Sequence, residues 1–264
     1  MRQLTILLVA VIGFVSCQST YFFSSLKTTD RYMEKVENGD FLLENDSLWI
    51  AYCFKGENAP IRITVFNKMT KPLYVDWAQS ALVIKGIAYS YVGEQSEYSE
   101  EMYQQSGDSW MSYFSTSKID RSDGYVSEIP TNRLVSRSAL RLNVSFEGLN
   151  RKVYKSRTIG NKDGEAKNVK VAEFSEEDSP LVFSSYLTTY TNKENPMVYR
   201  QDFYMSNLIK AKGLSPSQLP GELAKRGDMF YVEKPANNSF WEGLLGAGIV
   251  VGAVVLEAAL DSDE

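Results

Sequence analysis

The chain has 264 residues, 44% of them hydrophobic, which is enough for a substantial core, and its formal net charge is −5. Without a long basic stripe, it lacks the electrostatic footprint expected of a nucleic-acid-binding protein. Histidine does not occur, which removes the commonest general base, the Ser-His and Cys-His nucleophile arrangements and the most frequent nitrogen ligand of metals, so we expect a non-catalytic protein without a cofactor or metal.

The first 16 residues predict a lipoprotein signal peptide. Arg2 supplies a positive n-region, and the apolar run that follows is too short to span a bilayer comfortably. The segment Phe14-Val15-Ser16-Cys17 resembles the lipobox of bacterial lipoproteins, which implies that cleavage exposes Cys17 and that this residue carries the lipid. The alternative is an ordinary cleaved signal with Cys17 near the cut by coincidence.

The residues after Cys17 bear on localisation. Gln18 stands where, in the best-known sorting rule, an Asp retains a lipoprotein in the inner membrane, so the resemblance implies the outer membrane. Residues 19–22 lack the charged cluster that resembles a surface-export signal of Bacteroidota lipoproteins. We therefore expect a lipid anchor in the bacterial outer membrane, on its periplasmic face.

Residues 46–84 read as four short β-strands in succession, and the rest of the chain is organised around them. Turn-forming stretches at 56–60, 67–72 and 78–80 separate the strands. Within the strands, apolar side chains occupy alternate positions and predict one buried face: Leu48, Ile50, Tyr52, Phe54, Ile61, Ile63, Val65, Leu73, Val75 and Trp77. The pattern predicts an all-β, mainly antiparallel β-sandwich.

We expect the sandwich domain to cover residues 46–234, after an N-terminal tether and first strand at 17–45 that includes a helical turn at 29–36. A short helix is expected from Ser215 to Lys225. The other expected strands are residues 81–92, as a hairpin reversing at Lys85-Gly86, then 125–129, 140–146, 169–174, 181–190 and 197–209.

The most distinctive segment is 67–80, NKMTKPLYVDWAQS. It resembles a pattern in uncharacterised outer-membrane lipoproteins of Bacteroidota, which implies an immunoglobulin-like β-sandwich. Asp76 and Trp77 are either part of a binding site or, as we expect, structural, because a Trp in a strand is a large apolar anchor that normally packs in the core.

A long insertion at 93–124 interrupts the strands with acidic and aromatic residues. Connections of this length are often functional, and aromatic loops on a rigid scaffold are typical of binding surfaces. The alternative is that the aromatics only cover one open end of the sandwich. The candidates for partner contact are Tyr103, Trp110, Tyr113 and Phe114.

Three other features are expected to be structural rather than functional. Cys53 is the only other cysteine and is expected to be a lone buried thiol that acts as a small hydrophobe. Arg226-Gly227-Asp228 matches a cell-adhesion tripeptide, but so short a match recurs by chance. Adjacent carboxylates such as Glu100-Glu101 do not face each other across a bond as glycoside hydrolysis requires, so we expect them to be solvated.

Residues 239–260 are Gly-rich and apolar and predict a C-terminal helix. Its uncharged part is shorter than the ~20 residues that a membrane span needs. Gly248 and Gly252 have the spacing that lets helices approach closely. The helix therefore inserts partly, docks on the membrane, packs against a copy of itself or an envelope partner, or packs back on the sandwich.

Together these features predict a lipid-anchored cell-envelope protein with a non-catalytic structural or protein-binding role. Its expected partners are the membrane and an envelope protein or a second copy of the chain. The alternative is a glycan-binding module or carbohydrate-active enzyme that uses loop aromatics and carboxylates.

Overall fold

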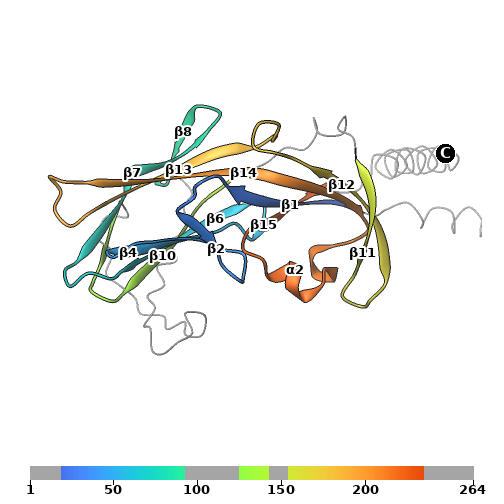
Figure 1. Cartoon of the computed structure of the whole chain (residues 1–264), viewed down its shortest axis with the longest axis horizontal. Coiled ribbons are helices and arrows are strands. Elements are labelled where there is room, and N and C mark those ends of the chain that lie inside the picture. Colours follow the sequence, from blue (N-terminus) through green and yellow to red (C-terminus); the bar gives the residue numbers. More distant parts are fainter. Residues whose placement is uncertain (1–18, 93–124, 143–153, 235–264) are drawn as a thin grey trace, which may run out of the picture. The chain divides into compact units, whose positions relative to one another are not determined.

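The computed structural model describes residues 19–92, 125–142 and 154–234, which form two β-sheets (Figure 1). Residues 21–233 form one compact unit. The pairs whose register is described are antiparallel, except for the parallel pair of β15 with β5. The prediction of a mainly antiparallel all-β fold with two sheets is therefore confirmed for the described residues.

The larger sheet has ten strands. Three of them branch from its main path: β9 (Val126–Ile129) pairs with β7, β12 (Ala166–Glu173) with β14, and β11 (Lys155–Gly160) with β12. The main path runs in the order β5 (Gly56–Glu57), β15 (Met229–Lys234), β1 (Thr20–Thr28), β14 (Met197–Lys212), β13 (Val182–Tyr190), β7 (Leu73–Ile84) and β8 (Ile87–Ser90).

The smaller sheet has five strands, and the two sheets contribute to a shared core. Its order is β10 (Leu134–Arg141), β6 (Pro60–Asn67), β4 (Leu48–Cys53), β3 (Phe41–Glu44) and β2 (Met33–Lys35). Residues 20–44, which we placed in a tether and first strand, thus supply β1 to one sheet and β2 and β3 to the other. The helical turn predicted at 29–36 is wrong, because pairing of β2 with β3 places Met33–Lys35 in the sheet.

Alternate burial in the central strands is confirmed. Leu48, Ile50 and Tyr52 are fully buried, and their neighbours in β4 are only partly buried. In β6, Ile61, Ile63 and Val65 are buried and alternate with the exposed Arg62 and the partly buried Thr64. These side chains belong to a cluster of buried residues from both sheets, which we call the main core.

The predicted turn at 78–80 does not exist, because β7 runs on through it as a bulge. Four residues of β7, from Trp77 to Ser80, stand opposite one residue of β13. The Ser80 hydroxyl donates to the Asp76 carbonyl (2.5 Å) and accepts from the Thr188 N–H (2.9 Å), and so fills the gap in the ladder. The hairpin at Lys85-Gly86 is confirmed, with φ of 51° and 79° at these two residues.

The far end of the larger sheet carries a second core on its other face. Phe22 and Phe23 are neighbours in β1, yet Phe22 packs in the main core and Phe23 in the second. The predicted short helix is present as the 3-10 turn η2 (Pro216–Gln218) and α2 (Gly221–Lys225), which lie near β11 and β15 (Figure 1). The buried members of the second core are Phe23, Val169, Val171, Ala211, Leu214, Leu219 and Met229.

Candidate functional site

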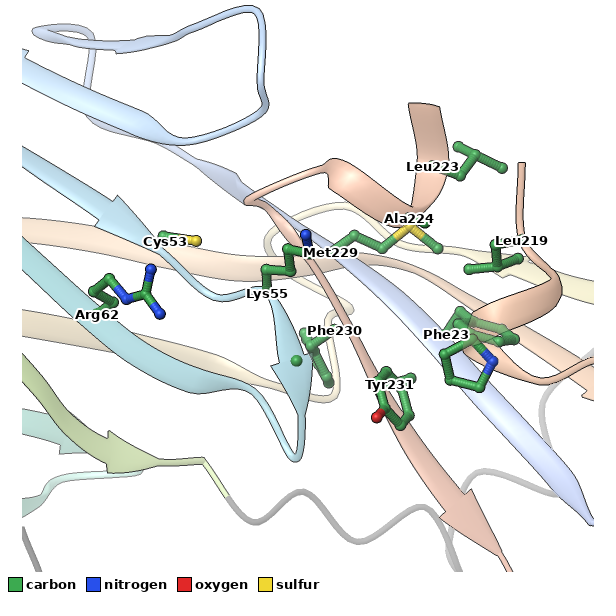
Figure 2. A pocket seen from close by; sticks show the side chains of 12 residues that line it. Phe23, Cys53, Lys55, Arg62, Leu219, Leu223, Ala224, Met229, Phe230 and Tyr231 are labelled. Atoms are coloured by element: carbon green, nitrogen blue, oxygen red, sulfur yellow. The ribbon is translucent and has the colours of Figure 1, made fainter. Parts of the chain in front are cut away.

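A pocket of about 420 Å³ opens where the second core meets the end of the smaller sheet. Strands β1 and β15 supply Phe23 and Tyr231, and α2 supplies Leu223. The end of β4 and the facing part of β6 supply Cys53 and Arg62. Segments from both sheets and the helix therefore build one site (Figure 2).

One end of the pocket is apolar. Phe23, Leu219 and Met229 are nearly fully buried members of the second core, and Leu223 and Ala224 of α2 are half-buried beside them. These side chains gather around α2 in Figure 2, away from Cys53 and Arg62. This wall offers apolar surface that is already partly withdrawn from water.

The other end of the pocket is cationic. Lys55 and Arg62 line it, and both side chains are exposed. Across the described ranges of the chain, neither cation has a carboxylate within 4.0 Å, and no carboxylate lines the pocket. The two positive charges are therefore free to meet an anion that enters from solvent.

Cys53 lies at this end as a free, half-buried thiol in β4. Burial, followed by the nearby Asp40 carboxylate, raises its pKa to about 11. The thiolate is the nucleophilic form of cysteine. At neutral pH Cys53 is therefore protonated and is a poor nucleophile.

Tyr231 of β15 also lines the pocket and pairs with Glu57 of β5. Partial burial raises the pKa of its hydroxyl, and the carboxylates of Glu57 and Glu233 raise it further. The phenol therefore stays neutral and can donate a hydrogen bond to a ligand.

A charged cluster formed by Lys35, Asp40, Arg226 and Asp228 adjoins the pocket through Asp40, which interacts with Cys53. The Asp228 side chain is fully buried, and its Oδ2 accepts from Lys35 Nζ and from Arg226 Nη2 (2.6 Å), while its Oδ1 accepts from Arg226 Nε (2.9 Å). Removing one partner of a buried ion pair is strongly destabilising, so we regard this cluster as structural.

Backbone hydrogen bonds tie the charged cluster to three elements. Gly227 N donates to Asn38 O (2.7 Å) and Phe54 N donates to Gly227 O (2.6 Å). Leu26 N of β1 donates to Asp228 O (2.9 Å). The tripeptide 226–228 therefore has a structural role: it joins β1, the residue that follows β4 and the β2–β3 turn.

The predicted site residues fall mostly outside the described ranges. Cys17, the helix-packing residues Gly248 and Gly252, and the whole 239–260 segment lie there. The same is true of the loop aromatics Tyr103, Trp110, Tyr113 and Phe114.

Of the described candidates, Trp77 is fully buried, donates from Nε1 to Ser127 Oγ (2.9 Å) and stacks under Arg137, as its structural interpretation predicted. Asp76 accepts from the backbone and side chain of Gln79 and stabilises the β7 bulge.

The pocket was not predicted from the sequence. Its residues come from segments as far apart as β1 and β15, and no local pattern joins them. The only usable signal was the pair Lys55 and Arg62, which flank the turn at 56–60, but two cations in a turn are ordinary surface residues.

Two kinds of feature are absent from the described residues. These residues contain no helix that is both long enough and apolar enough to cross a membrane. They also contain no group of three or more Cys, Asp or Glu side chains arranged to hold a metal ion.

A scan against protein-family models found no match, and searches of curated proteins and of solved structures found none either.

Proposed function

We propose that this chain is a lipid-anchored protein of the bacterial outer membrane, held on the periplasmic face through Cys17, with a non-catalytic binding role. The observation that carries the binding role is the makeup of the pocket. It offers an apolar wall and two unpaired cations, and its one thiol is protonated at neutral pH. Such a lining suits recognition of a ligand better than acid-base or nucleophilic chemistry.

We also propose an immunoglobulin-like topology for the sandwich and a helix at the C-terminus. The resemblance of 67–80 to Bacteroidota lipoproteins supports an immunoglobulin-like sandwich, and the apolar run at 239–260 supports a C-terminal helix that packs at Gly248 and Gly252. A contact with an envelope protein would fall on the aromatic loop. Replacing Tyr103, Trp110, Tyr113 and Phe114 together by Ala should then abolish capture of that partner in detergent, while the unfolding midpoint stays unchanged.

The anchor is tested by intact mass and membrane fractionation of the native protein. We compare it with a Cys17→Ala variant and, as the matched control, a Cys53→Ala variant. The anchor is supported if the wild-type and Cys53→Ala proteins are acylated and the Cys17→Ala protein is lost from the outer-membrane fraction. An unacylated wild type contradicts it. If Cys17→Ala stays in the membrane, the anchor lies elsewhere, and 239–260 becomes the segment to delete.

A further inference from the structure

We propose that the pocket binds a single-chain amphiphile with an anionic head, a fatty-acid carboxylate or a lysophospholipid phosphate. The head lies at Lys55 and Arg62, and the tail lies along the second core. This inference deepens the proposed binding role, and it depends on the proposed lipid anchor for the source of the ligand.

The dimensions and apolar wall of the pocket suit an alkyl chain. Its volume of about 420 Å³ lies within the range of roughly 300–1,000 Å³ typical of small-molecule sites. Phe23 and Met229 form a floor that belongs to the second core, and α2 adds Leu223 and Ala224. A chain laid on this surface removes apolar area from water, which favours binding.

The charges of the pocket select the head group. Arg62 is the end of the pocket farthest from α2, and Lys55 lies between them (Figure 2). Asp40 lies close enough to Arg62 for the two charges to interact, but it does not line the pocket. Glu57 and Glu233, whose carboxylates add to the effect of burial in raising the pKa of Tyr231, do not line the pocket either. A ligand with one anionic end and one apolar end therefore matches the pocket in only one direction.

The position of the pocket in the chain brings it within reach of a membrane. Phe23 lines it and lies in β1, which begins at Thr20. Only three peptide units separate Thr20 from Cys17. A lipid on Cys17 would therefore hold the start of β1 within about 10 Å of the lipidated residue. Lipids of the anchoring membrane are then the nearest source of amphiphiles.

The test uses the full-length Cys17→Ala protein in detergent-free buffer, where Cys53 is the one remaining thiol. Dodecanoate and lysophosphatidylglycerol are titrated by calorimetry below their micelle concentrations, with dodecyl maltoside as the uncharged control. Because the Cys53 thiol is protonated at neutral pH and the thiolate is the reactive form, its slow alkylation is followed at mildly alkaline pH, with and without ligand, as a report of pocket occupancy. We expect the two anionic amphiphiles to bind at least tenfold more tightly than the maltoside and to protect Cys53.

Variants then locate the two ends of the ligand. Arg62→Gln and Lys55→Gln should each weaken binding roughly two- to fivefold, because exposed cations contribute modestly. Leu223→Glu should weaken it more, since it places a negative charge on the apolar wall. The matched control is Lys193→Gln, an exposed cation in the distant β13–β14 loop, which should leave the affinity unchanged. Unfolding midpoints establish that each variant is folded.

The outcomes separate the sources of the ligand. Preference for lysophosphatidylglycerol identifies a membrane lipid, and preference for dodecanoate identifies a free fatty acid. Equal binding of dodecyl maltoside, absence of Cys53 protection, or an equal effect of Lys193→Gln overturns the proposal. If Cys17 proves unacylated while binding persists, the ligand class stands and only the membrane source is lost.

Discussion

Replacing Gly227 by Ala adds one methyl group and should lower the free energy of unfolding strongly. A Cβ at this position would lie 1.7 Å from Asp40 Oδ1, 2.8 Å from Asp40 Cγ and 3.0 Å from Asp40 N. Rotation of the carboxyl can relieve the first two contacts, but the third is to backbone. The Asp40 side chain must therefore leave its place, and the hydrogen bond that its Oδ2 accepts from Asn38 Nδ2 (2.8 Å) is lost.

The expected loss in the free energy of unfolding is about 2 to 4 kcal/mol, combining overpacking with a broken charge-assisted hydrogen bond. Gly221→Ala, six positions earlier, is the matched control. A Cβ there meets nothing within 4 Å, and Ala favours a helix, so this variant should gain about 0.5 to 1 kcal/mol.

The measurement is urea denaturation followed by tryptophan fluorescence, in the Cys17→Ala background. Trp77 is fully buried, so its emission should change on unfolding. Equal m-values in the three proteins would show that the midpoints report stability. If Gly227→Ala unfolds within about 0.5 kcal/mol of its parent, the close packing of Gly227 on Asp40 described above is wrong.

Three further predictions concern buried polar groups. Ser80→Ala should lower the free energy of unfolding by about 1 to 3 kcal/mol, because the buried Thr188 N–H loses its acceptor in the β7 bulge; an unchanged urea midpoint would contradict this. Tyr52→Phe should lower it by about 1 to 2 kcal/mol, because Gln201 loses the hydroxyl that donates to it at 2.7 Å; calorimetric unfolding would measure the loss, and a stabilised variant would count against it. Burial raises the pKa of Asp40, so the folded state holds the proton more tightly than the unfolded state does. The free energy of unfolding of the parent should therefore fall as pH rises from about 4 through the folded pKa. Asp40→Asn should lack this fall, and parallel stability curves for the two proteins between acid and neutral pH would refute the assignment.

The central strands could be predicted because their signal is local. One buried face leaves a period of two in β4 and β6, whatever the rest of the chain does. The β7 bulge could not be predicted in the same way. Ser80 is a typical turn residue, and only the partner strand reveals that its side chain replaces a ladder hydrogen bond.

The charged cluster and the pocket depend on contacts between distant segments. Asp228 is an ordinary acidic residue in the sequence and becomes the centre of a buried ion network only when Lys35, 193 positions away, meets it. The second core was also hidden, because Phe22 and Phe23 together look like one apolar patch rather than two opposite faces. Strand β10 begins at Leu134 rather than at the expected Leu140, since pairing with β6 sets its register.

The length of β14 has a consequence for how the protein unfolds. Its 16 residues pair with β13 along the first part and with β12 along the last. Phe203 and Met205 contribute to the main core, and Ala211 contributes to the second. Because one continuous strand belongs to both, neither core can lose its packing without exposing the other. The slowest-exchanging amides on the two faces should therefore open in a single cooperative event.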